Sequence, residues 1–427
     1  MVQKHYEWKI GETPPKIGEH SRSKHRILDR YLRRYIEICT TTPVQEKLNI
    51  SIVDGYSGGG KYLFNEQQID GSPLILLNAV AEMQDKLNRE RPKGFEIQTD
   101  FLFVDQNKNH TDYLRSEIEK SPFADQLDQS IQIWNNDFNL VVEDAIKLAK
   151  RRSPMRGRSL FILDQYGWSS VAFKSIRSIL KDLEKAEIFL TFNVDGLIDY
   201  MSTKRLEQNG YKQIDVDPGF IRELLSSKEE SAAWRALIQN SLYKHIKSET
   251  SATYYSPFFI RSPDAHRSYW FIHLSRHREA RNEIGNIHWQ ENNISLHHGR
   301  AGLQSLGFSR GADPSQLLLG YEFDDHARNS SKHTLMEQIP RIIRNAIDAD
   351  LAPSLEQLFG HECNDTPVTR ELFEEALIEL RMLGEVHIED AYGKDKPRAQ
   401  TVNWSDRIIL SRQRNFFGPF GSMGEKS

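Results

Sequence analysis

Short apolar runs alternate with segments of helical periodicity over residues 48–193. The runs are rich in Ile, Leu, Val and Phe, and the segments between them place apolar residues three or four positions apart. Strands that alternate with helices indicate right-handed crossovers, so the predicted fold is α/β, a doubly wound, mostly parallel, Rossmann-like sheet. Ser72 is expected as the N-cap of the first intervening helix and Pro73 as its first residue. The predicted strands are 48–54, 97–105, 131–137, 160–164 and 186–193, and the predicted helices are 71–87, 108–120, 139–151 and 170–185.

The segments that flank this core follow other patterns. Residues 22–39 carry apolar positions at helical spacing, so a helix is expected before the first strand, within an N-terminal helical segment over 1–47. After the last predicted strand the pattern becomes helical and polar, which indicates a helical insertion near 197–260. The apolar run 267–277 then predicts one more strand in the same sheet, so the Rossmann-like domain is expected over 48–290.

The C-terminal part predicts a separate unit over 331–415. A helical segment comes first, and a second strong helix follows, with Thr366 or Thr369 as its cap and Gly384 at its end. Residues 385–404 then indicate a β-hairpin. Two helices and a short hairpin outline a winged helix-turn-helix, which serves nucleic-acid binding in some proteins and protein packing in others. Both uses remain open from the outline alone.

Composition narrows the class of protein. The chain has 427 residues and a net charge of −4, which argues against an overall electrostatic grip on nucleic acid. No apolar run approaches the roughly 20 residues that span a bilayer, and the first residues lack the apolar core of a signal peptide. We therefore expect a cytoplasmic protein that does not associate with membranes.

Two kinds of local feature have simple interpretations. The two cysteines, Cys39 and Cys363, are far apart and are expected to be reduced and structural, and no metal-ligand spacing is present. Basic residues gather in 20–35 and 150–158. Either cluster could contact phosphates, and either could be a solvated helix face.

Acidic residues recur where the predicted strands end. The first strand leads into a glycine-rich turn after Asp54, the second ends at Asp105, the third at Asn136 and Asp137, and the fourth at Asp164. In doubly wound sheets ligands bind outside these carboxyl ends. Asp105 could accept bonds from ribose hydroxyls, and Asn136 or Asp137 could contact an adenine edge. The pattern predicts a nucleoside-containing cofactor.

The glycine-rich turn favours one such cofactor over another. It lacks the spacing of a phosphate-binding loop, and Asp54 before it would repel a pyrophosphate. The zwitterion of S-adenosyl-L-methionine (SAM) fits better, because carboxylate or carbonyl groups can meet its ammonium group.

Several motifs resemble known families. "VDGYSGGG" followed by "DGSPL" is similar to the start of bacterial large-subunit rRNA adenine methyltransferases, and the order of five motifs is closer to the three-Cys-motif partner (TcmP) family. The resemblance covers residues 20–290 and implies a class I SAM-dependent methyltransferase fold. It places Asp54, Gly58 and Gly60 at the methionine end of SAM, Asp105 at the ribose and Asp137 at the adenine. Tyr56 and Asn136 are further candidates for contact with the cofactor. The resemblance also implies a radical-SAM-like protein partner. The five motifs are "KHRILDRYL", "VDGYSGGG", "DGSPL", "LDQYGW" and "WFIHLSRH".

The segment "LDQYGW" carries the candidate chemistry. Amino-methyltransferases use D/N-P-P-Y/F here, where the acid and a backbone carbonyl accept the amine hydrogens and the aromatic ring stacks on the base. Asp164 matches the acid, Tyr166 arrives one position early, and Gln165 replaces the proline that the TcmP family tends to have. Losing proline frees the backbone, so the second acceptor is less firmly held. Alternatively, Asp164 only caps the next helix while Tyr166 and Trp168 pack over the sheet edge.

Three functions follow from these patterns. The leading hypothesis is a SAM-dependent methyltransferase acting on an RNA or DNA base amine, with Asp164, Tyr166 and Gln165 at the reaction centre. The second is a SAM-fold scaffold or nucleic-acid-binding subunit for the radical-SAM-like partner, with weak or no catalysis. The third is a Mg²⁺-dependent nuclease or antiphage effector in which the strand-end aspartates bind the metal.

Overall fold

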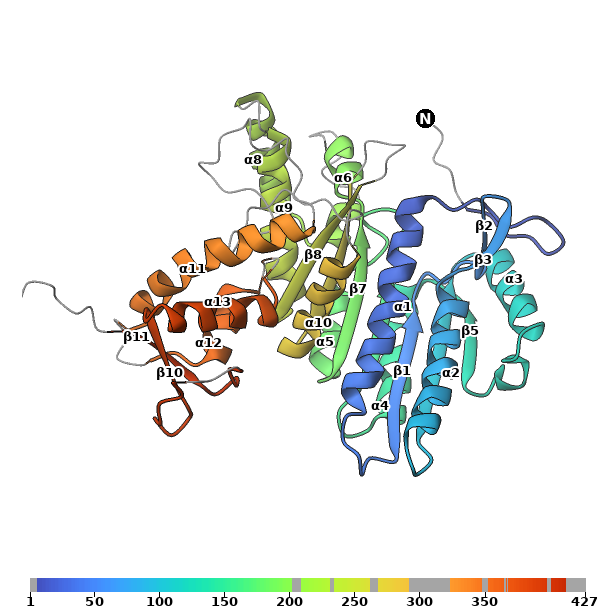
Figure 1. Ribbon diagram of the computed structural model, residues 1–427. Coiled ribbons are helices and arrows are strands. Elements are labelled where there is room, and N and C mark those ends of the chain that lie inside the picture. Colours follow the sequence, from blue (N-terminus) through green and yellow to red (C-terminus); the bar gives the residue numbers. More distant parts are fainter. Residues whose placement is uncertain are drawn as a thin grey trace, which may run out of the picture.

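A mostly parallel, seven-stranded sheet forms the centre of the computed structural model (Figure 1). The structure describes residues 6–201, 209–230, 234–261, 268–291, 323–347, 352–364, 366, 368–397 and 401–411. In sheet order the strands are β5 (Ile131–Asn135), β4 (Glu96–Asp105), β1 (Lys47–Asp54), β6 (Ser159–Leu163), β7 (Ala186–Phe192), β9 (Ser268–Ser275) and β8 (Tyr254–Arg261).

The strand order identifies the fold. The first five strands are parallel, and the order reverses on the two sides of β1. β9 runs antiparallel between β7 and β8. This is the arrangement of class I methyltransferases, so the predicted α/β, doubly wound fold is confirmed. The late strand that the sequence predicts over 267–277 also joins the same sheet, as β9.

Helices cover both faces of the sheet. One face packs against α1 (Glu19–Cys39), α2 (Ser72–Glu90), α3 (Lys108–Glu119) and α10 (Arg278–Gln290). The other packs against α4 (Phe138–Arg152), α5 (Phe173–Asp182) and the helical insertion, whose described helices are α6 (Val194–Tyr200), α7 (Asn209–Gln213), α8 (Pro218–Glu230) and α9 (Trp234–Thr250). Neighbouring residues of β1 alternate between the two cores, as Ile52 and Val53 do.

Several elements escaped the sequence prediction, among them a hairpin, an edge strand and a helix. A hairpin of β2 (Lys61–Phe64) and β3 (Gln67–Asp70) turns at Asn65 and Glu66, which have positive φ angles of 46° and 64°. The sequence at this turn is Asn-Glu rather than the Asn-Gly pair that usually marks such a hairpin. β8 contains Pro257, which is tolerated because the strand lies at the sheet edge. In α10 polar residues are buried together with apolar ones, so its sequence lacks an apolar stripe.

Two expected helix starts need correction. Gly71, rather than Ser72, is the N-cap of α2, and the Ser72 hydroxyl donates to Asp54 instead of capping. The N-terminal segment is helical only from Glu19. Residues 6–17, named the strap below, form no helix and contain a turn at 10–12. They pair with β2 through backbone bonds between Leu63 and both Pro15 and Ile17.

The C-terminal unit is a winged helix, as predicted. It contains α11 (Asp325–Ile347), α12 (Leu355–Glu362), α13 (Arg370–Met382), β10 (Val386–Glu389) and β11 (Arg407–Leu410), and it lies on the β8 side of the sheet (Figure 1). Thr369 caps α13 and Gly384 follows the end of that helix. The partner strand of β10 is β11, beyond the hairpin expected over 385–404.

Within the described ranges, no helix combines the length and apolar character that crossing a membrane would require.

Candidate active site

The topological switch point of the sheet lies between β1 and β6. β1 pairs with β4 on one side and with β6 on the other, and all three strands end at the same edge. Ligands of open α/β sheets bind in the crevice at such a point. The glycine-rich turn after β1 and the segment "DQYGW" after β6 therefore flank the expected ligand crevice.

Asp54 at the end of β1 is an internal anchor. Its side chain is fully buried, and one carboxylate oxygen accepts the backbone N–H of Tyr56 at 3.1 Å. The other oxygen accepts the Ser72 hydroxyl at 2.6 Å, which ties the turn to the start of α2. Burial raises the pKa of Asp54 to about 7. The Asp54 side chain thus fixes the conformation of the turn through these two hydrogen bonds.

The turn itself needs glycine at two of its positions. Gly58 and Gly60 have φ angles of 58° and 78°, which favour residues without a Cβ. The Gly58 N–H donates to the Asp105 carboxylate at 3.1 Å. The fold therefore brings Gly58 and Gly60, in the turn after β1, close to Asp105 at the end of β4. All three were assigned to SAM from the sequence.

The strap covers this turn with an aromatic ring. Trp8 is 3% exposed, its indole N–H donates to the Lys61 carbonyl at 2.6 Å, and a Cβ at Gly59 would collide with its ring. Only glycine at position 59 leaves room for the Trp8 ring in this arrangement. Sequence reasoning missed the strap, because an isolated Trp in a Pro- and Gly-containing stretch gives no periodic signal.

Asp105 at the end of β4 keeps limited capacity for a ligand. Besides Gly58, its carboxylate accepts the Asn107 N–H at 2.8 Å and lies 3.1 Å from Nδ1 of His110. A carboxylate has about four acceptor positions, so about one is left for a further donor. The side chain is 14% exposed and therefore within reach of a ligand at the sheet edge.

The third strand end is open to solvent. Asp137 is exposed and caps α4 by accepting the Asn139 N–H at 2.8 Å. The Asn136 side-chain oxygen accepts the Asp137 N–H at 2.9 Å.

Tyr56 joins the glycine-rich turn to the loop after β6. Its hydroxyl donates to the Ser170 carbonyl at 2.8 Å.

Asp164 at the end of β6 forms an ion pair with Lys24 of α1, at 2.5 Å between Oδ1 and Nζ. Burial alone would raise the pKa of Asp164, but the Lys24 charge outweighs it and holds the pKa below its ordinary value. Burial lowers the pKa of the adjacent His25 to about 4, so His25 is neutral near pH 7. Lys24 is a residue that sequence reasoning missed, since it stood among solvated arginines.

Gln165 fixes the loop that follows. It is 1% exposed, and its side-chain oxygen accepts the backbone N–H groups of Ser170 and Val171 at 2.8 and 3.0 Å. Its amide nitrogen is buried without a hydrogen-bond partner in the described part of the chain. The glutamine thus closes the loop through hydrogen bonds from its side chain.

The two aromatic residues of the loop lie on different surfaces. Tyr166 is 40% exposed, and its ring lies edge-on to Tyr6 of the strap, with 6.5 Å between centroids. Trp168 packs on Tyr211 of the helical insertion at 5.3 Å. The N-cap of α5 is Ala172, so Asp164 does not cap the next helix.

Nearby carboxylates neutralise the arginines of the α1 cluster and part of the 150–158 cluster. In the 150–158 cluster Lys150 pairs with Asp182 and Arg152 with Asp100. Phosphate contacts at these residues would compete with existing pairs. The pairs of α1 are Arg22–Glu19, Arg26–Glu19, Arg26–Glu291, Arg30–Glu291, Arg33–Asp29, Arg33–Glu82, Arg34–Glu37 and Arg34–Glu283.

The strand-end aspartates do not form a metal site. Across the described ranges, no three His, Cys, Asp or Glu side chains are grouped as a metal ion would require. Both oxygens of Asp54 are bound within the protein, and Asp164 is paired with a cation. This arrangement argues against the Mg²⁺-dependent nuclease.

A buried arginine joins the winged helix to the sheet domain. Arg281 of α10 is 2% exposed and donates to the carbonyls of Cys363, Thr366 and Val368 in the segment before α13. The Asn282 side chain accepts the backbone N–H at the start of α13 at 2.6 Å. The N-terminus of α13 is therefore held against the sheet domain.

Three glutamates of α13 are paired with nearby cations, and one of them, Glu374, pairs with Arg370 of the same helix. Arg328 and Lys332 of α11 pair with Glu375 and Glu379 of α13. The N-terminus of a recognition helix is the end that usually enters a DNA groove, and in α13 this end is bound to Asn282 of the sheet domain. α13 is thus poorly suited to reading nucleic acid.

Comparisons with known proteins agree with the domain order. Residues 309–393 match the family model of the GMT-like wHTH domain. No curated protein is a significant match to the chain.

Among solved structures, the chain is similar to a DUF519 protein of Legionella pneumophila, at 11% identity and a TM-score of 0.31 over 61% of this chain and 85% of that one. It is similar to a protein of Methanococcus maripaludis described as an S-adenosyl-L-methionine-dependent methyltransferase, at 14% identity and 0.25 over 62% and 97%. It is also similar to a protein of Galdieria sulphuraria described as a sarcosine dimethylglycine methyltransferase, at 11% and 0.25 over 60% and 87%. The fold assignment itself rests on the strand order.

Proposed function

We propose that this chain is a SAM-dependent methyltransferase that modifies an amine of an RNA or DNA base. The observation that carries the proposal is that β1 and β6 are neighbouring parallel strands. The glycine-rich turn after β1 and the Asp164 and Tyr166 residues after β6 therefore lie on the two sides of the switch point. A carboxylate acceptor and an exposed ring at this position suit an amine on a flat aromatic base.

The residues at the sheet edge fit a nucleoside cofactor. Asp105 keeps an acceptor for a ribose hydroxyl, Asn136 and Asp137 are exposed for the adenine, and the backbone of Gly58 and Gly60 can approach the methionine end closely. When bound, SAM supplies the electrophilic methyl group. Because Trp8 rests on the same turn, the cofactor and the strap must share that surface.

Each residue of the loop has a distinct task in this mechanism. The Asp164 carboxylate, kept ionised by Lys24, accepts a hydrogen bond from the acceptor amine and orients the nitrogen lone pair. Tyr166 stacks on the base, a contact worth about 1–3 kcal/mol. Gln165 keeps both residues in place through its bonds to Ser170 and Val171. The amine proton leaves to water after transfer.

The match to a winged helix-turn-helix family model favours a nucleic-acid substrate, whereas the contacts of α13 do not. Because the N-terminus of α13 is bound to the sheet domain, we assign substrate contact to the wing, which is formed by β10 and β11. We assign the winged helix a docking role and leave base recognition to the Asp164 loop.

Two contacts favour a second function. Trp8 covers the glycine-rich turn, and Lys24 occupies the carboxylate that an amine would need. These contacts suit a SAM-fold scaffold for a protein partner, for which the family resemblance suggests a radical-SAM-like protein.

Methyl transfer from radiolabelled SAM to total cellular RNA and to genomic DNA tests the proposal. We expect label in one of the two pools with the intact protein, and loss of more than 90% of it, about the effect of removing one essential contact, with Asp164→Asn. Asp182→Asn, an exposed aspartate on α5, is the matched control and should retain transfer. Absence of label from both pools with the intact protein would favour the scaffold.

A further inference from the structure

The strap lies on the surface of the glycine-rich turn that SAM would use. The Trp8 indole packs on the backbone of two glycines: a Cβ at Gly58 would lie 2.8 Å from the ring, and a Cβ at Gly59 would overlap it. The indole N–H also donates to the Lys61 carbonyl at 2.6 Å. Glycines without a Cβ let a ligand approach the backbone closely. In this arrangement an aromatic ring takes that place.

The strap also contacts the proposed ribose acceptor, through His110. The His110 ring lies edge-on to Trp8 with 4.8 Å between centroids, and its Nε2 lies 3.8 Å from the Glu7 carboxylate. Its Nδ1 lies 3.1 Å from the Asp105 carboxylate, the group that would accept a ribose hydroxyl. Trp8 and Glu7 therefore hold His110 beside the carboxylate that the cofactor needs.

A third contact of the strap is with the loop after β6. Tyr6 lies edge-on to Tyr62 of β2 and to Tyr166, with 5.5 and 6.5 Å between centroids. Tyr166 is the residue that we propose to stack on the acceptor base. The strap thus contacts both sides of the switch point.

Few bonds oppose detachment of the strap. In the described part of the chain, the backbone of residues 6–14 forms no hydrogen bond with the backbone of the rest of the protein, and the bonds to β2 involve only Pro15 and Ile17. Among the described ion pairs, Glu7–His110 alone joins the strap to the rest of the chain, at 3.8 Å. Segments with few such bonds open locally at a free energy well below that of global unfolding. Residues 6–14 can therefore detach while the sheet domain stays folded.

We propose that the strap is an autoinhibitory gate, which must detach from the glycine-rich turn before SAM can bind. This inference rests on the proposed function, because it takes the crevice at the switch point as the SAM site. A closed strap reduces the apparent affinity for SAM in proportion to the fraction of molecules in which the strap is open. A gate of this kind differs from a lid, since a lid would close over the bound cofactor.

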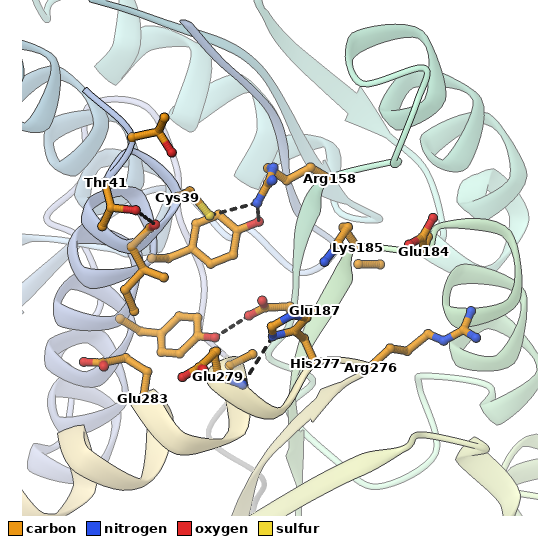
Figure 2. Close-up of a pocket in the computed structure, with 16 residues that line it drawn as sticks. Cys39, Thr41, Arg158, Glu184, Lys185, Glu187, Arg276, His277, Glu279 and Glu283 are labelled. Atoms are coloured by element: carbon orange, nitrogen blue, oxygen red, sulfur yellow. Dashed lines mark hydrogen bonds between the residues drawn. The ribbon is translucent and has the colours of Figure 1, made fainter. Parts of the chain in front are cut away.

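A separate cavity provides a distant control position. It has a volume of about 250 Å³ and lies at the opposite edge of the sheet, where β6 and β7 begin (Figure 2). Its wall carries carboxylates and cations together, among them Glu187 and Lys185. No residue that lines it belongs to the strap, so Lys185→Gln should leave the gate unchanged.

Calorimetric titration of SAM into the full chain tests the gate. We expect Trp8→Ala to bind SAM at least about tenfold more tightly than the intact protein, which corresponds to an open fraction of about one tenth or less. Ile10→Ala, at a strap side chain that is 63% exposed, and Lys185→Gln should bind as the intact protein does. Saturable but equal or weaker binding by Trp8→Ala would overturn the gate and leave the cofactor assignment standing. Absence of saturable binding by both the intact protein and Trp8→Ala would refute the gate and the cofactor assignment together.

Trypsin gives a second readout that needs no variant. The protease cleaves after lysine, so the bond between Lys9 and Ile10 reports on the strap. Saturating SAM should make this cleavage about tenfold faster, because proteolysis follows the population of the open form. Mass spectrometry of early fragments measures the rate. Unchanged cleavage would overturn the gate, and so would slower cleavage, which would show that the strap closes over the cofactor. If Trp8→Ala fails to fold, this measurement decides.

Discussion

Lys24 and Asp164 are separated by 140 positions in the chain and form an ion pair at 2.5 Å. The pair joins α1 to the carboxyl end of β6, which is the part of the sheet edge where the candidate chemistry lies. It fixes the charge of the carboxylate and places a cation beside it.

Removing the Lys24 charge should destabilise the protein. Lys24→Met leaves a largely buried carboxylate unpaired, so the free energy of unfolding near pH 7 should fall by about 3 kcal/mol. Because pairing depresses the pKa of Asp164, its contribution is present above the unfolded pKa of about 3.9 and is lost as the pH falls through the folded value. Urea titrations at several pH values measure the effect.

The control for this variant is Lys147→Met, which removes an exposed ion pair with Asp144 on α4. It should leave the unfolding free energy essentially unchanged. Equal effects of the two substitutions would show that Lys24 and Asp164 are not coupled.

Asp54 should oppose folding as the pH rises. Its folded pKa is about 7 against about 3.8 in the unfolded chain, so the unfolded state loses its proton first. The Asp54 contribution to stability is greatest below pH 4, falls between pH 4 and 7, and is constant above. Asp54→Asn lacks this dependence, so its stability relative to the intact protein should rise across that window. A difference that does not change with pH would refute the assignment.

The Gln165 side chain should be essential to the loop. Gln165→Met leaves the Ser170 and Val171 N–H groups without their acceptor, and the unfolding free energy should fall by about 2 kcal/mol. The same substitution at the exposed Gln129 is the control and should have little effect. Chemical denaturation compares the two, and equal midpoints would argue against a role of Gln165 in closing the loop.

Gly59 should be required for the strap. In Gly59→Ala the new methyl group collides with Trp8, so the strap should detach and become sensitive to protease between residues 6 and 17. Gly94→Ala, at a position with open space around it, should keep the intact cleavage pattern. Mass spectrometry of early fragments gives the result, and an unchanged pattern in Gly59→Ala would show that Trp8 does not need this glycine.

The alternating strands and helices could be predicted because buried parallel strands are nearly continuous apolar runs. This holds for "LFIL" of β6 and "AEIFLTF" of β7, both wholly buried. β8 escaped prediction because of Pro257, and α10 because Arg281 and its polar neighbours are buried by contacts with the winged helix. Those contacts arise only after folding.

The strand-end aspartates could be predicted as a group, because parallel strands end at one edge. Their individual roles could not. Asp54 is bound to Ser72 and Asp164 to Lys24, partners that no local pattern connects to them. The same is true of Trp8, whose contact with the glycine-rich turn joins segments about fifty positions apart.

The most direct measurement is calorimetric titration of SAM into the intact protein and into Asp105→Ala, with Asp112→Ala on the exposed face of α3 as the control. Our account predicts saturable binding to the intact protein and to the control, and affinity at least about tenfold lower in Asp105→Ala, as expected when a ligand loses a charged hydrogen-bond acceptor. Absence of saturable binding to the intact protein, or equal affinity in all three, would contradict it.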